Sequence, residues 1–480
     1  MEVEQRPIDL EKHYTLEPQS STADVTIVTW YSATDSDNPH NWTRGKKLWF
    51  GFLILIYSLA VYIGASLYTA AIPTMKEMWG LGTVAVSVGL SIYVVGYGVG
   101  PLVLSPLSEL PHVGRNPSYI IGFAIFVILC VPTALVDNFA GMLVLRFLMG
   151  FFGSPALASG GASYGHIYGP LHLPYAIALW AGGASAGPAL GPLISNFAVV
   201  AENWRWAFWE LLWLSGPVFL AMFFFLPETS ADWILLQCAK RLRKLTGRTD
   251  LKAQCEIRQQ KKSRKEVLYQ ALIKPWEINA KDPAVLFTTI YTGLIYGIYY
   301  SFFESFPLVF RDVYGWSFGI MGLAFLSIAV GCLLAVLVWL GYFYFYANKH
   351  IAAMMATGVM APPETRLAPG LLFTFFIPAG LFIFCVTMSM IGNFVIAQCM
   401  LIYLPFTYPR YASSLFAANG LSRASLAAAA ILFSIPMFEN MGVDKGVTLL
   451  GGLCCGCCVG IYILYFFGAK LRKRSKFAES

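Results

Sequence analysis

Long apolar stretches recur along the chain and alternate with short polar segments. Each stretch holds about 20 residues, the length of helix that crosses the hydrocarbon core of a bilayer. Twelve such stretches begin near Leu48, Val84, Pro117, Ala140, Pro174, Trp206, Ala284, Phe318, Ala368, Ser389, Ala412 and Gly446. The pattern therefore predicts twelve membrane-spanning helices.

The longest polar interruption after the first helix lies at residues 228–283 and divides the predicted helices into two groups of six. The pattern predicts an all-α membrane protein with one six-helix bundle over 48–227 and a second over 284–468. Residues 1–47 are polar and predict a flexible arm, and residues 469–480 form a basic tail. Two six-helix halves joined by a linker are typical of transporters built from repeats.

One part of the second half is short for its predicted content. Residues 368–408 number only 41 and must hold the ninth and tenth spans. Three interpretations remain open: a very tight hairpin, one short span, or a lost piece of chain. Eleven full spans would place the basic tail on the side opposite the N-terminus, so twelve spans are retained.

Composition and charge support a membrane protein. Hydrophobic residues make up 57% of the chain and charged residues 12%, whereas soluble domains contain about 25% charged residues. Of the 33 Lys and Arg residues, 27 fall in segments on the side of the N-terminus and 4 in segments on the opposite side. This asymmetry predicts that both termini and the linker are cytoplasmic. The net charge of +7 therefore reflects topology, and we expect no nucleic-acid partner.

The linker contains one amphipathic stretch. Apolar residues recur at helical spacing among Lys and Arg over residues 234–245. Such a helix either lies along the inner membrane face or is simply solvated, and the sequence does not choose between these.

Three ionisable residues fall inside predicted spans: Arg146, Glu304 and Arg423. Such residues are costly in lipid and mark function by default. A carboxyl group in apolar surroundings can exchange protons near neutral pH, which makes Glu304 a candidate for proton coupling. The alternatives are that Glu304 faces water at the outer interface and that Arg146 only packs helices against a backbone carbonyl.

Aromatic residues surround Glu304 in the sequence. Aromatic side chains offer large flat surfaces that can hold apolar or cationic ligands. The residues expected to line a substrate pocket are Tyr299, Phe303 and Phe306.

The predicted fifth span carries glycines four residues apart, at Gly183, Gly187 and Gly191. Glycines at this spacing let another helix approach closely. Pro188 and Pro192 follow two of these glycines and favour a kinked helix.

A short turn after the second span carries Glu109, Gly114 and Arg115. A carboxylate and a guanidinium beside a tight turn can pair with neighbouring helix ends, which would latch one conformation and release it in another. An ordinary surface ion pair is the alternative.

Several segments together resemble a known family. They are Asp37–Trp42, Gly96–Pro101, Ser105–Glu109, Gly114–Pro117, Arg146 with Gly150, the Gly-Pro pattern of span 5, and Leu226–Thr229. From about Asp37 to its end, the chain resembles fungal major facilitator transporters of the twelve-spanner drug:proton antiporter family. It is similar to the benomyl, fluconazole and cycloheximide resistance transporters.

The resemblance implies a major facilitator fold and export of small amphipathic compounds across the plasma membrane, driven by protons through alternating access. It implies a monomer without a cofactor or metal. Arg146 would couple protons, Glu109, Gly114 and Arg115 would form the latch, and the span-5 Gly-Pro pattern would be the antiport motif. Glu304 is added to the coupling residues on its sequence setting alone. At the end of span 4 the family has an acid, where this chain has His166; an imidazole can also carry protons.

Other functions remain open. The same fold could take up or equilibrate a nutrient or metabolite, or the chain could be an inactive membrane protein with a damaged second half. A membrane enzyme would need a His/Asp cluster at a span end, and the sequence has none. No ATP-binding Walker A signature is present, so the energy source is expected to be an ion gradient.

Overall fold

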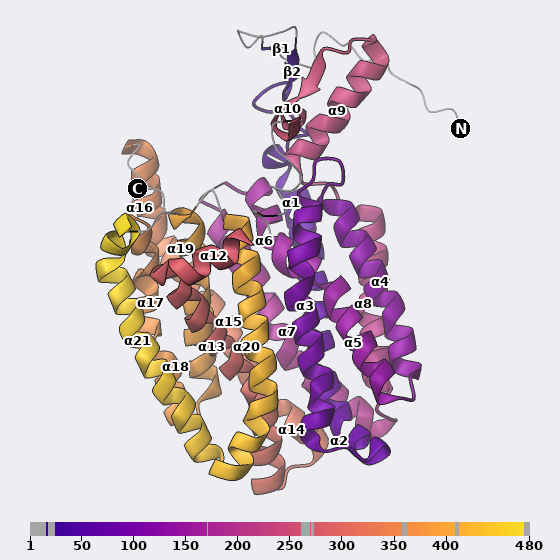
Figure 1. The fold of residues 1–480 in the computed structure, drawn as a ribbon, viewed down its shortest axis with the longest axis vertical. Coiled ribbons are helices and arrows are strands. Elements are labelled where there is room, and N and C mark those ends of the chain that lie inside the picture. Colours follow the sequence, from indigo (N-terminus) through magenta and orange to yellow (C-terminus); the bar gives the residue numbers. More distant parts are fainter. Residues whose placement is uncertain are drawn as a thin grey trace.

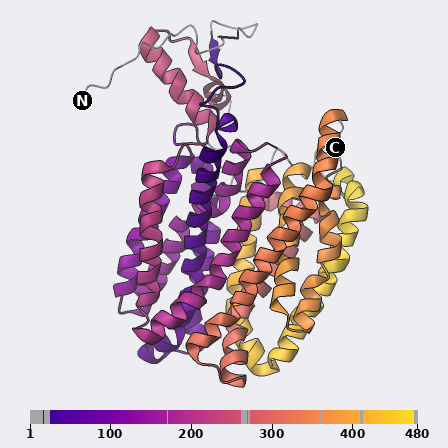
Figure 2. The same cartoon turned by 180° about the vertical axis from the view of Figure 1, so that it is seen from behind.

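The computed structural model describes residues 16–17, 25–169, 171–260, 269, 273–357, 362–408 and 412–474. Its helices form two groups that lie side by side, the first half from indigo to magenta and the second from orange to yellow (Figures 1 and 2). The all-α membrane fold predicted from the apolar pattern is confirmed.

Six spans form the first half, and two of them are interrupted. The first breaks at Leu67, and the fourth breaks at Ser154, where Pro155 begins the next helix. Proline is favoured in the first helical turn because its missing N–H would be unpaired there. The helices are α1 (Arg44–Ser66), α2 (Tyr68–Trp79), α3 (Thr83–Ser108), α4 (Arg115–Leu135), α5 (Phe139–Gly153), α6 (Pro155–Ile167), α7 (Leu173–Ala201) and α8 (Trp206–Phe225).

The second half also contains interrupted spans, including two π-helical segments, η2 and η3, and a 3-10 helix, η4. Its elements are α13 (Pro283–Phe306), η2 (Pro307–Val313), α14 (Phe318–Ala324), α15 (Leu326–Tyr342), η3 (Phe343–Ala347), α16 (Asn348–Thr357), η4 (Pro363–Leu367), α17 (Ala368–Phe373), α18 (Phe376–Phe382), α19 (Val386–Thr407), α20 (Ala412–Met441) and α21 (Val443–Arg474). In the described part of the chain, eleven helical stretches are long and apolar enough to cross a membrane. The shorter apolar helix α5, continued by α6, accounts for the remaining crossing.

The ninth and tenth spans form a very tight hairpin. Helix α18 ends at Phe382 and α19 begins at Val386, so the turn is only three residues long. Phe384 adopts a left-handed φ of 53° in this turn. The ninth span also starts earlier than Ala368, because η4 already begins at Pro363. The tight-hairpin interpretation is therefore the one that the structure supports.

The linker and the arm form a small folded unit beyond the end of the bundle. The linker contains α9 (Ala231–Thr246), β3 (Leu251–Ala253), α10 (Gln254–Gln260) and α12 (Lys274–Lys281), and the arm contains β1 (Leu16–Glu17), β2 (Thr26–Val28) and the 3-10 helix η1 (Pro39–Asn41). Strand β2 pairs antiparallel with β1 and parallel with β3. The described residues of the arm, 16–17 and 25–47, thus contain regular structure where the polar composition predicted a flexible segment.

The apolar face of α9 is covered by this sheet. The buried residues of the unit are Val28, Leu236, Ala239, Leu242, Leu251, Ala253 and Cys255. Helix α9 extends away from the bundle in Figure 1, so it neither lies along the membrane nor is solvated on all sides. Sequence periodicity identified the apolar face but could not show that a distant strand covers it.

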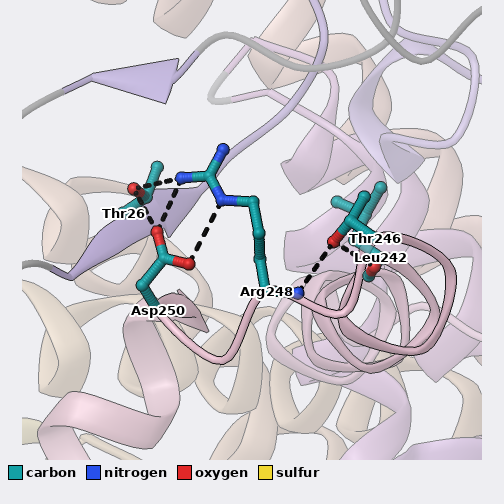
Figure 3. Close-up of polar contacts among 5 residues, drawn as sticks. All are labelled: Thr26, Leu242, Thr246, Arg248 and Asp250. Carbon is teal, nitrogen blue, oxygen red and sulfur yellow. Dashed lines mark hydrogen bonds and ion pairs between the residues drawn. The ribbon is translucent and has the colours of Figure 1, made fainter.

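A polar clamp joins the arm to the linker (Figure 3). Asp250 Oδ2 accepts hydrogen bonds from Arg248 Nη2 at 2.6 Å and from Thr26 Oγ1 at 3.0 Å. The Arg248 guanidinium also donates to Thr26 Oγ1 at 3.2 Å. Hydrogen bonding from Arg248 lowers the pKa of Asp250 to about 2. The clamp holds β2 against β3 at the edge of the sheet.

We expect Asp250→Ala to loosen β2 from β3 while leaving the transmembrane helices in place. Hydrogen exchange on the purified chain should become faster at Ile27 and Val28. Because the pKa of Asp250 is lowered, its contribution is present above the unfolded value near 3.9 and is lost as pH falls toward 2. In the wild-type chain, the hydrogen-exchange protection factors of these two amides should therefore be equal at pH 7 and pH 5. The control is Asp232→Asn, which removes an exposed ion pair with Arg258; equal exchange in both variants would contradict the clamp.

Candidate functional site

The two halves meet along α3 and α7 of the first half and α13, α15 and α20 of the second. Ser91 Oγ on α3 donates to the Ala428 carbonyl on α20 at 3.0 Å. Glycine allows the closest approach, because a Cβ at Gly98 on α3 would overlap the side chain of Ala424. The candidate site is built at this interface.

Tyrosines from both halves join at the interface through their hydroxyl groups. Tyr97 on α3 lies 2.8 Å from the Tyr296 hydroxyl and 3.1 Å from the Tyr300 hydroxyl, both on α13. Tyr62 on α1 packs its ring 5.8 Å from that of Tyr97. On the other side of the cluster, Tyr299 donates to the Ser185 carbonyl on α7 at 3.2 Å. One network therefore connects three helices of the first half with α13.

Arg423 on α20 reaches the same network. Its guanidinium carbon lies 5.4 Å from the Tyr296 ring centroid, within the range of a cation–π contact. Its Nε atom is buried and has no hydrogen-bond partner among the described residues. The sequence marked Arg423 as an in-span cation but could not show that a tyrosine cluster would surround it, because the helical pattern of α20 does not identify the face that meets the other half.

Glu304 lies on α13 and is only 8% exposed. Within the described chain its Oε1 atom has no hydrogen-bond partner. The Ser87 hydroxyl on α3 lies near the carboxyl group without completing a hydrogen bond. Burial of an unpaired charge is costly, so proton uptake at this carboxyl group relieves an energetic penalty. The structure therefore places Glu304 inside the protein at the interface between the halves, which contradicts the alternative that it faces water.

The predicted pocket residues are also buried. Tyr299, Phe303 and Phe306 are 4%, 2% and 1% exposed. Phe303 and Phe306 pack their rings 5.2 and 4.7 Å from Phe325 at the start of α15. Tyr299 contacts both Phe303 and the tyrosine cluster. Phe303 and Phe306 therefore pack within the second half, whereas Tyr299 also contacts the first half through the Ser185 carbonyl.

Arg146 on α5 is fully buried and donates to three backbone carbonyls. The acceptors are Gly64 at 2.6 Å, Ala65 at 3.1 Å and Gly89 at 3.1 Å. Gly64 and Ala65 lie at the end of α1, just before the break at Leu67. A cation is favourable at a helix C-terminus, where the carbonyl groups carry partial negative charge. Arg146 therefore connects span 4 to the break in span 1 and to α3.

Tyrosine rings enclose the Arg146 guanidinium. Its central carbon lies 4.3 Å from the Tyr93 centroid and 4.9 Å from the Tyr68 centroid. The two tyrosines in turn donate to the carbonyls of Val61 and Val86. The alternative raised from the sequence, a packing role with carbonyl partners, matches these contacts, and a part in proton coupling stays a prediction.

The turn after α3 is held by a carboxylate from the linker. Glu228 Oε2 accepts from the backbone N–H groups of Arg115 and Asn116, each at 3.0 Å. A carboxylate at a helix N-terminus is stabilised by the unpaired N–H groups and the helix dipole. Gly114 has a φ of 78°, and a Cβ there would lie 2.6 Å from this carboxylate. Glu228 thus holds the predicted latch segment, a role that the sequence analysis did not identify, and Glu109 lies close enough to Arg115 for an electrostatic interaction.

His166 and Arg115 meet at the end of span 4. Arg115 Nη2 lies 3.1 Å from His166 Nε2, and Nη1 donates to Ser163 at 3.1 Å. A guanidinium can only donate, so Nε2 accepts this bond and the imidazole is neutral. The structure therefore joins His166 to the latch segment and not to Glu304.

The predicted antiport motif forms the contact between α7 and α1. A Cβ at Gly183 would lie 3.0 Å from Leu55. A Cβ at Gly187 would lie 2.9 Å from Tyr62 Cβ and 3.1 Å from the Leu59 carbonyl. A Cβ at Gly191 would overlap Ser66 Oγ. Pro188 and Pro192 lie inside the continuous helix α7 and are buried. The glycines thus let two helices of the first half approach backbone to backbone.

Comparison with known proteins identifies the family. The model of the Major Facilitator Superfamily matches residues 54–431. The MFS-type transporter pyvG of Aspergillus violaceofuscus is 44% identical over 96% of this chain and 87% of its own length. The Fluconazole resistance protein 1 of Saccharomyces cerevisiae is 35% identical, covering 94% of this chain and 85% of its own length. The Cycloheximide resistance protein of Candida maltosa is 34% identical, with coverages of 94% and 86%.

A solved structure shows the same fold. A peptide transporter, POT, crystallised with sulfate, superposes with a TM-score of 0.60 and covers 91% of this chain and 98% of its own. Its sequence identity is 13%, so the likeness concerns the fold alone.

We expect Gly191→Ala to destabilise the first half. The added methyl group would overlap Ser66 Oγ and lie 3.0 Å from the Leu67 amide nitrogen, so α7 must move away from α1. Overpacking of this kind costs about 1–3 kcal/mol and should lower the thermal unfolding midpoint of the purified chain. Gly216→Ala in α8 is the matched control, since a Cβ there meets no atom within 4 Å. An unchanged midpoint for Gly191→Ala would contradict the close packing.

Proposed function

The chain belongs to the major facilitator superfamily, and on this premise we propose that it exports amphipathic drugs or toxic metabolites, driven by the inward flow of protons. Relatives at 34–35% identity carry names of resistance to fluconazole and cycloheximide. Each of them aligns over at least 94% of this chain, so the comparison includes both halves. The protein acts as a monomer in the plasma membrane.

The proposed orientation places both termini and the linker in the cytoplasm. The described arm, the linker and the C-terminal end of α21 lie at the same end of the bundle (Figure 1). This end carries the excess of Lys and Arg, as the positive-inside rule requires for a cytoplasmic face.

Alternating access would rock the two halves about the tyrosine network. The two ends of the linker are attached to different halves of the protein. Its first part belongs to the first half, since Glu228 caps α4 and Trp233 lies beside Gly114. Its last part belongs to the second half, since Ile278 is buried with Val285, Leu404 and Leu415. The described parts of the linker are therefore attached to different halves.

The observation that carries the proposal is Glu304, a buried carboxyl group with an unpaired oxygen at the interface of the halves. A group at this place can bind a proton from one side and release it to the other when the halves rock. Proton binding stabilises the closed interface, and proton loss favours an arrangement that hydrates the carboxylate. The proton gradient thereby biases the two states that alternate access requires.

The same interface supports a substrate class. Tyr62, Tyr97, Tyr296 and Tyr300 supply flat rings and hydroxyl groups, and Arg423 supplies an N–H donor that has no acceptor among the described residues. An amphipathic compound with an aromatic body and a hydrogen-bond acceptor fits this chemistry. Binding would require the halves to separate, because the tyrosine hydroxyl groups join them in the present conformation.

We expect Glu304→Gln to abolish uphill export while leaving the protein at the membrane. The amide keeps the shape of the carboxyl group but cannot exchange a proton. In a fungal host that lacks its own drug exporters, the variant should restore no resistance to cycloheximide or fluconazole, and vesicles with an imposed pH gradient should accumulate no substrate. Glu439→Gln, at an exposed position near the end of α20, should behave as wild type. Normal export by Glu304→Gln at normal abundance would place the coupling group elsewhere.

We expect His166 to make export sensitive to cytoplasmic acidity. A second proton on the imidazole would remove the acceptor of Arg115 and leave two cations 3.1 Å apart. His166→Asn keeps an acceptor that does not titrate, and His166→Asp adds a carboxylate that pairs with Arg115. Export by these variants, measured in vesicles across a pH series, should match wild type at high pH and exceed it at low pH. Three identical pH profiles would show that His166 is only a helix-end residue.

A further inference from the structure

Arg423 differs from the other in-span arginine in how its donors are satisfied. Arg146 donates to three backbone carbonyls, which is how a cation inside a membrane protein is usually stabilised. Among the described residues, Arg423 has no ion pair and no hydrogen bond, and its Nε atom is buried. A buried donor without an acceptor is costly, and a bound molecule that supplies an acceptor would remove this cost.

The Arg423 side chain lies against the tyrosine network. One turn earlier on α20, Asn419 donates to Thr292 on α13 at 2.9 Å, which fixes this face of α20 against α13. The guanidinium carbon of Arg423 lies 5.4 Å from the Tyr296 ring centroid, and the group is close enough to Tyr62 on α1 for an electrostatic interaction. Arg423 therefore lies where the two halves meet and is close to aromatic rings from both.

The network lies deep in the membrane-spanning part of the protein. Tyr97 and Tyr296 are each near the middle of their helices, α3 and α13. In transporters built from two halves, substrates bind near the bilayer midplane, where the halves meet. The cation without an acceptor is therefore at the depth expected of a substrate site.

Glu304 does not serve as the counter-ion of Arg423. It follows Tyr296 by eight residues on α13, which is about 12 Å along the helix axis. Its carboxyl group lies near Ser87 on α3, and no ion pair joins it to Arg423 in the described part of the chain. The carboxyl group proposed to bind protons and the cation therefore occupy separate places in the interface.

The groups around Arg423 suit one kind of ligand. A guanidinium binds a carboxylate through two parallel N–H···O bonds, a geometry that favours planar oxyanions over single acceptors. The hydroxyl groups of Tyr97, Tyr296 and Tyr300 are further donors, and their rings offer flat surfaces to an aromatic body. A cationic compound would meet a like charge without a counter-ion.

We infer that Arg423 selects compounds that carry a carboxylate on an aromatic body. The inference rests on the proposed function, because it assigns the chemistry of the same central interface. The carboxylate accepts from the Arg423 guanidinium, and the aromatic body lies against the tyrosine rings once the halves separate. Neutral aromatic compounds bind the rings without this interaction and therefore bind more weakly.

The test compares two fluorescent probes that share one aromatic body. Dansylglycine carries a carboxylate that is ionised at pH 7, and dansylglycinamide carries a neutral amide of almost the same size. Each probe is titrated against the purified full-length chain in lipid nanodiscs without a pH gradient, and empty nanodiscs correct for partition into lipid. Binding is measured from the dansyl fluorescence. We expect dansylglycine to bind several-fold more tightly than dansylglycinamide.

Two substitutions at Arg423 separate charge from geometry. Arg423→Gln removes the charge and should weaken dansylglycine binding to the level of dansylglycinamide, whose own affinity should change little. Arg423→Lys keeps a charge without the paired N–H groups and should give an intermediate loss. The thermal unfolding midpoint of each variant is measured in parallel. If Arg423→Gln unfolds, Arg423→Lys decides the outcome, and unchanged dansylglycine binding by it would contradict the paired contact.

Arg311→Gln is the matched control. The Arg311 guanidinium also lies over a ring, 5.5 Å from the centroid of Phe318, but the residue is exposed in η2. This substitution removes the same charge outside the central interface and should leave both affinities unchanged.

Equal binding of the two probes by the wild-type chain, or binding of neither, would overturn the inference. A preference for dansylglycine that persists in Arg423→Gln would assign it to another residue. If inorganic phosphate displaces dansylglycine as well as unlabelled naphthoate does, the site holds a simple anion and does not select aromatic carboxylates. These titrations measure binding without transport, so they can succeed where the Glu304 experiment fails, and the reverse.

Discussion

No water is available in the hydrocarbon core of a membrane, so each polar group there must find its partner inside the protein. Arg146 shows how fully this constraint can be met. Its guanidinium donates to Gly64, Ala65 and Gly89 and lies between two tyrosine rings. Hydrogen bonds of a charged group contribute about 1.5–3 kcal/mol each. These contacts connect α5 to α3 and to the break between α1 and α2, and the rest of the first half is arranged around them.

Some of the buried groups that lack a hydrogen-bond partner among the described residues lie where the two halves meet. Glu304 Oε1, Arg423 Nε and Trp339 Nε1 are buried without hydrogen-bond partners among the described residues. The first two lie at the interface of the halves. In the proposed mechanism a proton would bind to Glu304, and a substrate would accept a hydrogen bond from Arg423. The third belongs to α15, within the second half.

Two features are compatible with the proposed rocking of the halves: the close packing of helices at glycines, and the attachment of the two ends of the linker to different halves. The span-5 glycines let α7 pack closely against α1, and Gly98 lets α3 and α20 touch across the interface. The arm and the first part of the linker are clamped together by Thr26, Arg248 and Asp250. Helix α12 belongs to the other half. This division of the linker is compatible with the alternating access proposed above.

The sequence by itself determined the fold class, the two groups of spans and the in-span ionisable residues, because hydrocarbon thickness and the cost of charge in lipid act on local composition. It also located the span-5 glycines, whose spacing of four is a property of one helix. Only the tertiary structure decided which side chains meet. The pairing of β2 with β3, the cap that Glu228 provides for α4, the tyrosines around Arg423 and the bond between Arg115 and His166 all join residues far apart in the chain. The tight hairpin at Phe384 likewise required the structure, because composition does not show how few residues a turn can use. Contacts of this kind depend on which helix faces meet, and helical periodicity in one segment carries no information about its partner.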